Sequence, residues 1–400
     1  MKIFFLYFIH VLGLFYFLGA PENLVKSFVL FLTFFVLIVN INKIKFYKYY
    51  LYLFLFIIFI FQSFSNFSDV ISFGFPFIIL FTGSFLFNLY KNFKEDDVKF
   101  HIKNLIYVSL FGVFLKLILH GIDEGFLIGF LSMNAGQLGF LFPSLMLIFI
   151  FELFKDNKTR ILFFILLFLF AIINEKRSII FFFPIILIYY QGFRILNLNK
   201  FIPAIALYCL ALFLIPSLNP DNKAFGTIDI FYPFQYALEY LTATYDGGLQ
   251  GNKLEAITNT GSQYGRFALL QSIIDFASNY FTQSNILFGH GMGTFTLSAS
   301  AETYFDDTMF KLLGFRGTLS TALIIFLDSG FIALTFFILF LFRYLIFLFR
   351  DIKLNHMILL IVFYDIFFYS DAFLKILPIS IYFFTLFPFV FYRKINKDIQ

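Results

Sequence analysis

The chain has 400 residues, of which 60% are hydrophobic and only 13% are charged. A water-soluble protein of this length needs more charge to cover its surface, so the composition excludes an ordinary soluble enzyme and favours an integral membrane protein. The formal net charge is a modest +5, and no nucleic acid is expected as a partner.

Long apolar stretches recur along the chain, and about 20 apolar residues in a helix cross a bilayer. We therefore predict an all-α, polytopic membrane protein with about 12 transmembrane helices and one large extracytoplasmic loop that contains short helices. Residues 1–218 hold the first nine helices, 219–318 the loop, and 319–400 the last three helices with a cytoplasmic tail. The predicted spans are 3–20, 25–41, 49–64, 70–90, 105–119, 134–153, 161–174, 178–193, 201–218, 323–342, 357–374 and 377–392.

The loops between these spans alternate in their content of Lys and Arg. Segments 43–48, 91–103 and 155–160 are basic, whereas 21–24 and 65–69 are not, and the C-terminal tail is basic again. Because short basic loops stay in the cytoplasm, both termini are expected there and the large loop outside.

The first polar interruption of interest separates the predicted spans 161–174 and 178–193. It reads Asn174-Glu175-Lys176-Arg177. Ionisable groups beside a membrane cavity are functional candidates, which makes Arg177 a candidate ligand for an anion. A topological stop explains the same residues.

The stretch 219–318 is polar and long, and such connections are usually functional. It carries 9 acidic and 5 basic residues and 11 of the 23 glycines. Apolar periodicity predicts two short helices within it, near 233–245 and 265–278. Tyr236 and Tyr240 share a face of the first helix.

Arg266 opens the second of these loop helices, directly after Gly265. A helix N-terminus attracts anions through free N–H groups and its dipole, and a guanidinium adds a paired donor suited to phosphate. The alternative is a solvated surface arginine.

A glycine-rich segment follows, with Gly289, Gly291 and Gly293 at alternate positions. Glycines in this pattern allow close approach of the backbone to a ligand, although a plain turn has the same composition. His290, between the first two glycines, titrates in the range of a general base at neutral pH, or is incidental to the loop.

Carboxylates inside apolar stretches are the last candidates. Asp328 precedes Ser329-Gly330, and Asp365 lies near the middle of a predicted span. An ionised carboxylate in hydrocarbon costs on the order of 2.5–3.5 kcal/mol by insertion scales, so Asp365 is expected to face a cavity or a partner such as Lys116 or Arg343, for packing or for function. The pair Asp306-Asp307 lacks a third ligand at suitable spacing, so we expect no metal site.

Taken together, these elements resemble the O-antigen polymerase and ligase superfamily over roughly residues 105–375. The order of the elements carries the resemblance more than their identity. The matching pieces are an outward Arg-Ser element at Asn174–Ser178, a long late outer loop, its Gly265-Arg266 element, a Gly-x-Gly-x-Gly signature at Asn285–Gly293, and a return into the membrane at Leu319–Leu334.

The resemblance implies a Wzy-type polymerase of the bacterial inner membrane. Its substrate would be an oligosaccharide on undecaprenyl diphosphate, presented among membrane lipids at the periplasmic face, with a polysaccharide chain-length regulator as a partner and no cofactor. The growing chain would leave its lipid diphosphate and join the next unit. Arginines would bind the diphosphate, with Arg177, Arg266 and Arg316 as candidates. A base would activate the acceptor hydroxyl, and the candidates for it are His290, Asp246, Glu255 and Asp328. Tyrosines would stack on sugars, with Tyr236 and Tyr240 as candidates.

Two other functions remain open. An O-antigen ligase would transfer polymer to lipid A–core, but ligases of this superfamily usually carry a His before the return into the membrane, where this chain has Ser320-Thr321. A flippase or transporter would more often show repeated halves, midplane charges and short loops.

Overall fold

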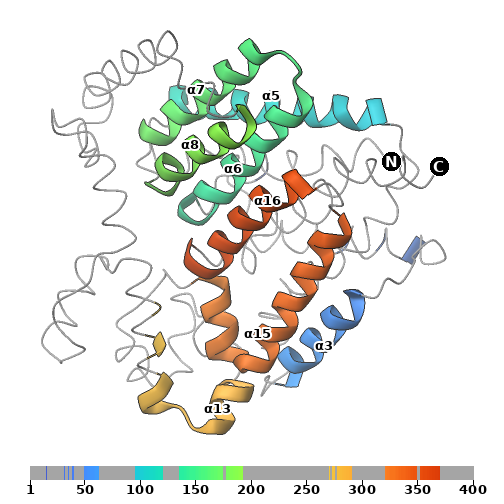
Figure 1. The fold of residues 1–400 in the computed structure, drawn as a ribbon, viewed down its shortest axis with the longest axis vertical. Coiled ribbons are helices and arrows are strands. Elements are labelled where there is room, and N and C mark those ends of the chain that lie inside the picture. Colours follow the sequence, from blue (N-terminus) through green and yellow to red (C-terminus); the bar gives the residue numbers. More distant parts are fainter. Residues whose placement is uncertain are drawn as a thin grey trace, which may run out of the picture. The chain divides into compact units, whose positions relative to one another are not determined.

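A computed structural model of the chain describes a set of helical segments (Figure 1). No β-strand occurs within these described residues, so the predicted all-α class is confirmed for this part of the chain. Spans expected elsewhere, such as 70–90, 201–218 and 377–392, lie outside the description. Apart from isolated positions, the described residues are 49–62, 95–119, 135–173, 177–191, 277–290, 320–348 and 352–369.

The chain divides into two compact units, each of which combines segments distant in sequence. Unit 1 comprises Met1–Glu22 with Asp96–Leu241, and unit 2 comprises Asn23–Glu95 with Thr242–Gln400. The predicted division at residues 218 and 318 stays a prediction, because much of 192–319 is outside the described residues.

Unit 1 is built around a helix that is buried on every side. This helix is α6 (Ala135–Leu153), which contacts both α7 (Asn157–Ile173) and α8 (Arg177–Gln191). All side chains from position 140 to 151 are buried, including Ser144. A helix that is apolar all round needs a non-aqueous environment on every face, and α6 finds it among its neighbours. The observed helices agree with the predicted spans 134–153, 161–174 and 178–193 to within a few residues.

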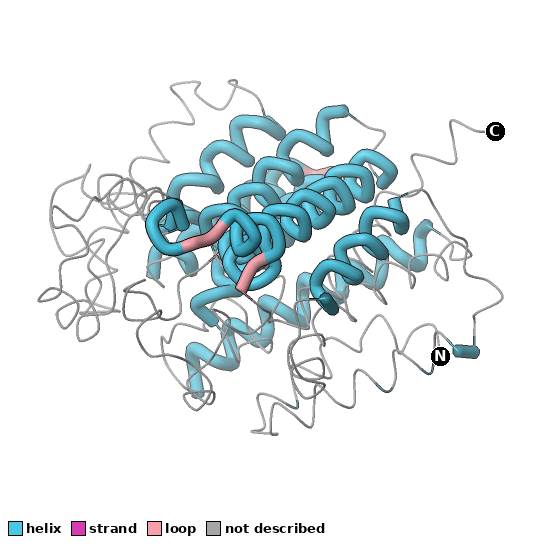
Figure 2. The backbone as a smooth tube through the Cα atoms, turned by 90° about the horizontal axis from the view of Figure 1, so that it is seen from below, coloured by secondary structure: helices cyan, strands magenta, loops and turns pink. Residues whose placement is uncertain are grey.

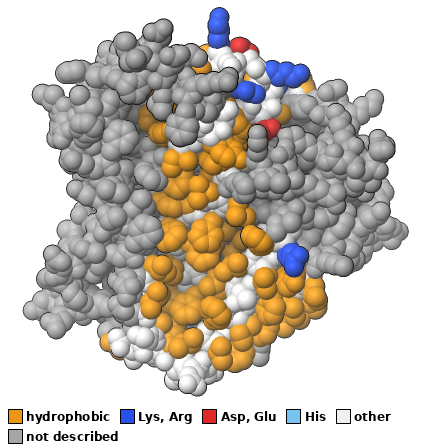
Figure 3. All heavy atoms as spheres, in the orientation of Figure 1, with side chains coloured by type: hydrophobic (Ala, Val, Ile, Leu, Met, Phe, Trp, Pro, Cys, Tyr) orange, Lys and Arg blue, Asp and Glu red, His pale blue; other side chains and the backbone are white. Residues whose placement is uncertain are grey.

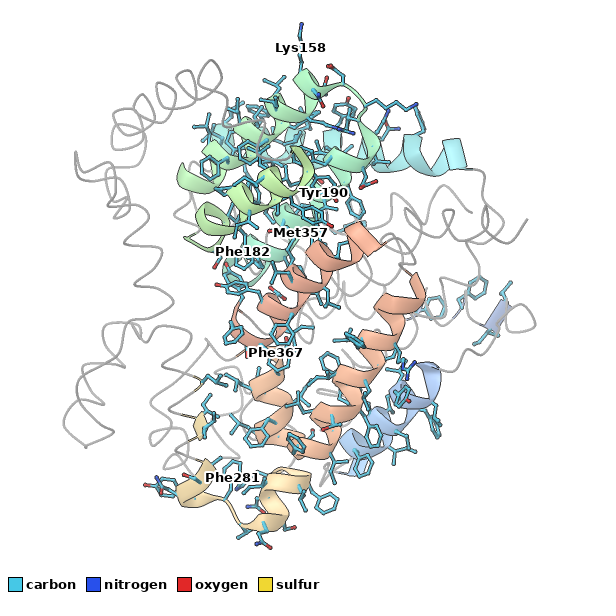
Figure 4. All side chains as sticks on the ribbon, in the orientation of Figure 1. Lys158, Phe182, Tyr190, Phe281, Met357 and Phe367 are labelled. Atoms are coloured by element: carbon cyan, nitrogen blue, oxygen red, sulfur yellow. The ribbon has the colours of Figure 1, made fainter. Side chains whose placement is uncertain are left out.

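Aromatic rings hold the helices of unit 1 together. Phe140 of α6 meets Phe182 of α8 with ring centroids 5.0 Å apart, and Phe151 stacks on Tyr190 at 4.9 Å. Figure 4 labels Phe182 and Tyr190 on α8. Edge-to-face and offset pairs of this kind each contribute about 0.5–1.5 kcal/mol beyond their buried area. The abundant phenylalanine is therefore used here as packing material.

A three-residue turn joins α6 to α7, and Asp156 fixes it. The Asp156 carboxylate accepts hydrogen bonds from the backbone N–H groups of Lys158 and Thr159 and from the Thr159 hydroxyl. These bonds lower the pKa of Asp156 below its usual 3.8, with the Thr159 hydroxyl as the largest cause. Arg160 also donates from Nε to the Phe154 carbonyl. The turn is thus a capped helix start.

A further described helix of unit 1, α5 (Glu95–Leu119), presents a row of large apolar side chains to the outside. The row follows helical spacing, and Ile118 reaches 77% exposure. The helix begins ten residues before the predicted start at 105, because its first turn is the acidic Glu95-Asp96-Asp97. Acidic side chains favour a helix N-terminus, which hydropathy does not detect. The exposed residues are Phe100, Tyr107, Phe111, Phe114 and Ile118.

Unit 2 is organised by α15 (Thr321–Leu348), a helix broken at Gly330. Its first part, up to Ser329, and its second part, from Phe331, meet at an angle beside α13 (Gln283–Phe288), as Figure 1 shows. Helix α3 (Tyr49–Gln62) packs along α15, with Phe56 5.0 Å from Phe337 between ring centroids.

The C-terminal helix of the described part, α16 (Ile352–Tyr364), continues into a π-helical turn, η6 (Asp365–Tyr369). This turn contacts α15, and Asp365 within it is completely buried. Short π-helical turns inside α-helices recur at functional positions. The span predicted at 357–374 is therefore helical from 352, with an irregularity that begins at Asp365.

Among the residues that the structure describes, one stretch, Thr321–Arg343, is long and apolar enough to cross a membrane by length and composition alone. Its geometry corrects the expectation of a continuous span at 323–342, because the backbone is not helical at Gly330. The part after the break has 18 residues, which at ~1.5 Å per residue is about 27 Å, close to the ~30 Å of a hydrocarbon core. Shorter apolar helices are Ile106–Leu119, Phe140–Leu153 and Met357–Tyr369.

Hydrophobic side chains make up most of the described surface that faces the viewer in Figure 3. Charged side chains gather near the turn between α6 and α7. In unit 2, exposed apolar residues also lie on the outer faces of α3 and α15, among them Leu51, Phe54, Phe331 and Phe342. Soluble monomers rarely expose continuous apolar surface of this kind.

Candidate functional site

The structure describes four of the predicted site residues. Gly289, His290 and Asp328 belong to unit 2, and Arg177 is the first residue of α8 in unit 1. The other predicted site residues lie outside the described part of the chain: Asp246, Glu255, Arg266, Arg316, Gly291, Gly293, Tyr236 and Tyr240.

Gly289 ends helix α13 in a conformation that only glycine adopts readily. Its φ is 79° and its ψ is −173°, and its N–H donates to the Asn285 carbonyl over 2.8 Å. At the other end of α13, the Thr282 hydroxyl caps the helix by accepting from the N–H of Asn285. Both ends of this short helix are therefore fixed by local hydrogen bonds.

Gly330 breaks α15 in nearly the same conformation, with φ 81° and ψ 178°. This region of φ/ψ space is almost exclusive to glycine and costs other residues about 1–3 kcal/mol. Two glycines about forty positions apart in sequence thus end two helical segments in the same way.

The two glycines lie against each other's chain, in an arrangement that we call the glycine crossing (residues 287–290 with 327–330). A Cβ on Gly289 would come within 3.0 Å of the Asp328–Ser329 peptide, and a Cβ on Gly330 would come equally close to the Leu287–Phe288 peptide. Real Cβ atoms essentially never approach backbone so closely. The contact is reciprocal, because each glycine packs on the peptide just before the other.

A hydrogen bond ties the crossing together. The backbone N–H of His290 donates to the Leu327 carbonyl over 3.2 Å. In an unbroken helix, that carbonyl would accept from the N–H of Phe331, four residues later. The break at Gly330 thus turns the end of the first part of α15 toward the loop after α13.

The His290 ring is held by two side chains from its own segment. Nδ2 of Asn285 lies 2.8 Å from Nε2 of the imidazole, and the ring of Phe281 packs against it with centroids 4.2 Å apart. Figure 4 labels Phe281 just before α13, and Figure 2 shows the short loops that flank this helix. Burial lowers the pKa of His290 below its usual 6.5, so the ring is neutral at pH 7.

Asp328 lies on the opposite side of the crossing and is completely buried, with 0% exposure. The first part of α15 carries two further buried polar side chains, Thr321 and Ser329. Buried polar groups are costly unless they are bonded, and their concentration on nine residues distinguishes this part from the apolar second part.

The crossing brings together two segments that the sequence marked separately, the Gly-x-Gly-x-Gly segment and the Asp328-Ser329-Gly330 segment. Sequence reasoning missed Asn285 and Phe281 as neighbours of His290, and it gave Gly330 no role. The only signal for the break was a polar Asp-Ser-Gly inside an apolar run. Within the described residues, no group of three His, Cys, Asp or Glu is placed to hold a metal ion.

No protein-family model, curated protein or solved structure matches this chain.

Proposed function

We propose that this chain polymerises oligosaccharide repeat units carried on undecaprenyl diphosphate at the periplasmic face of the bacterial inner membrane. The observation that carries the proposal is the glycine crossing. The crossing brings the start of the Gly-x-Gly-x-Gly segment against the segment around Asp328, which is predicted to return into the membrane. These are the two late elements on which the resemblance to O-antigen polymerases rests.

Membrane integration is part of the proposal, and the surface of the described helices supports it. Helix α3, the stretch of α5 from Ile106 to Leu119 and the part of α15 after Gly330 carry large apolar side chains on their exposed faces as well as on their buried faces. Lipid is the solvent in which such helices are stable, because the acyl chains cover the outer face and the helix satisfies its own backbone. About 12 spans, with both termini in the cytoplasm, would complete the topology.

The proposed reaction transfers a glycan from a lipid diphosphate to a sugar hydroxyl. The hydroxyl oxygen of the incoming unit bonds to the anomeric carbon of the growing chain, the bond from that carbon to the diphosphate breaks, and the hydroxyl proton passes to a base. Asp328, His290, Asp246 and Glu255 are the candidates for that base. The activated donor supplies the free energy, so no nucleotide or other cofactor is required.

Arginines would stabilise the leaving diphosphate, whose negative charge grows as the bond breaks. Donors aimed at that charge lower the transition state more than the ground state. Arg177, Arg266 and Arg316 are the candidates on the outer side, and Tyr236 and Tyr240 would stack on sugar rings. A chain-length regulator would act on the same growing polymer.

The test is the lipopolysaccharide profile of a strain from which this gene is deleted. A polymerase defect leaves a single repeat unit on each lipid A–core, and the plasmid-borne gene restores the ladder. The glycine variant Gly330→Ala should fail to restore it, whereas Leu339→Ala, an exposed position on the same helix, should restore it fully. Polymer that never reaches core would identify a ligase, and units retained inside the cell would identify a flippase. Either outcome would overturn the proposal.

A further inference from the structure

The side chain of Asn285 leaves α13 from a fixed backbone. Its N–H donates to the Thr282 hydroxyl over 3.2 Å, and its carbonyl accepts from the N–H of Gly289 over 2.8 Å. From this position its Nδ2 reaches Nε2 of His290 at 2.8 Å. The amide is thus presented to the imidazole by the same short helix that the glycine crossing holds against α15.

The chemistry of the two groups determines where the proton on the imidazole resides. An amide nitrogen carries two hydrogens and only donates. With the amide nitrogen toward the ring, as the structure has it, the facing ring nitrogen accepts and is the bare one, and a neutral imidazole has only one bare nitrogen. With Nε2 accepting from Asn285, the ring proton is on Nδ1.

Packing around the His290 ring also opposes a ring flip, which would swap the positions of Nδ1 and Nε2. Phe281 packs against it at 4.2 Å with an angle of 50° between the planes, and Phe281 stacks in turn on Phe326 of α15. The backbone N–H of His290 is bonded to the Leu327 carbonyl. Because these contacts hold both the ring and its backbone, Nε2 stays beside the Asn285 amide and the ring proton stays on Nδ1.

We propose that Asn285 is a positioning residue that holds His290 as a neutral imidazole protonated on Nδ1, so that His290 serves as a hydrogen-bond donor and not as a general base. The placement of the proton follows from the contacts of unit 2 alone. The consequence for the reaction rests on the proposed function.

That consequence concerns the base in the glycosyl transfer. A general base needs a bare nitrogen within hydrogen-bond reach of the hydroxyl that it deprotonates. The bare nitrogen of His290 faces the Asn285 amide instead. Nδ1 of His290 is buried in the structure, so His290 would act as a donor only toward an oxygen that reaches this buried position, and a carboxylate such as Asp328, Asp246 or Glu255 would take the proton.

The tautomer can be read directly by nitrogen NMR on the full chain, labelled with ¹⁵N-histidine and reconstituted in lipid nanodiscs at pH 7.5. The chain has five histidines, so the other four are replaced by glutamine to leave His290 as the sole signal: His10, His101, His120 and His356. We expect a protonated Nδ1 and a bare Nε2. A bare Nδ1 with a protonated Nε2 would overturn the proposal, because the amide would then present its oxygen.

The role of Asn285 is tested by Asn285→Asp in the same background. A carboxylate accepts where the amide donates, so the proton should move onto Nε2, or the ring should become doubly protonated. A spectrum unchanged from that of the parent would refute the assignment of Asn285. The matched control is Gln283→Asp, an exposed position on the same helix, which should leave the His290 signals in place.

The consequence for activity is measured separately by complementation of the deletion strain. Asn285→Asp should reduce polymer about 10²–10³-fold at normal membrane levels, the usual effect of losing one fixed donor in an active site, whereas Gln283→Asp should give a full ladder. A full ladder from Asn285→Asp, in spite of a shifted proton, would refute the role in catalysis. A deletion strain with a normal ladder would refute the proposed function and leave the NMR result standing.

Discussion

The glycine crossing makes a quantitative prediction, because each glycine meets the other segment's backbone. Alanine at Gly330 would have to keep a conformation almost exclusive to glycine, at about 1–3 kcal/mol, and would also place a methyl group into the Leu287–Phe288 peptide. Forcing an extra carbon into a packed site costs about another 1–3 kcal/mol. We therefore expect Gly330→Ala to destabilise unit 2 by about 2–6 kcal/mol, and Gly289→Ala by a similar amount.

The double variant distinguishes the crossing from two unrelated strained glycines. Once one alanine has separated the segments to an ordinary contact of 3.4–4 Å, the second alanine meets no backbone. The conformational cost is incurred twice but the clash only once, so the double variant should be about 1–3 kcal/mol less destabilised than the sum of the singles.

The assay is stepwise heating of the detergent-solubilised protein, followed by size-exclusion chromatography of the fraction that remains monodisperse. For a domain of this size about 2–4 °C corresponds to 1 kcal/mol, so each single variant should lower the midpoint by roughly 5–20 °C. Leu287→Ala and Leu339→Ala, which truncate exposed side chains on the two helices, should shift it little. Strictly additive shifts in the double variant, or unchanged midpoints in the singles, would refute the reciprocal contact.

Four further predictions concern the site and the topology. Arg266→Ala should abolish polymer at normal membrane levels and Arg266→Lys should leave short chains, because lysine keeps the charge but loses the planar fork; full ladders from both on silver-stained gels would remove Arg266 from the site. Reporter fusions at residue 250 should be extracytoplasmic and those at 98 and 397 cytoplasmic, and a cytoplasmic signal at 250 would overturn the placement of the loop. Activity should survive EDTA; loss that a divalent ion reverses would redirect attention to Asp306 and Asp307. Because burial lowers the pKa of His290 in the folded state, the unfolded chain takes up the proton more readily, and the folded state loses stability as the pH falls below about 6.5. The thermal midpoint should therefore drop between pH 7 and 5 in the wild type and drop less in His290→Gln. Equal drops would contradict this assignment.

The sequence by itself located the long apolar helices of the described part of the chain, whereas the short helix α13 was not predicted. Apolar runs bounded by polar residues predicted α3, α6 and α8 to within a few residues, because a helix satisfies its own backbone wherever the surroundings are apolar. Where polar residues continue a helix, this signal fails. The first ten residues of α5 are helical although they include three consecutive acidic side chains, since these favour a helix N-terminus.

The sequence also selected Gly289, His290 and Asp328 as candidates, but each from a local feature: the glycine pattern, a histidine within it, and a carboxylate inside an apolar run. It gave no means of joining them, because Leu287 and Asp328 are about forty residues apart and no local pattern encodes their contact. Asn285 and Phe281 were overlooked for a related reason. Their importance lies in facing His290, which depends on the backbone conformation of Gly289 after α13 and on the bond between His290 and Leu327.

Only the tertiary structure decided that α15 is broken. From composition alone, residues 323–342 were predicted as one uninterrupted apolar helix, and a glycine within such a helix is tolerated at a cost of about 1 kcal/mol. Whether that glycine stays helical depends on what approaches it. Here the Leu287–Phe288 peptide occupies the space that a Cβ would need, and the Leu327 carbonyl bonds to His290. The break is thus a property of two segments in contact, and neither segment specifies it alone.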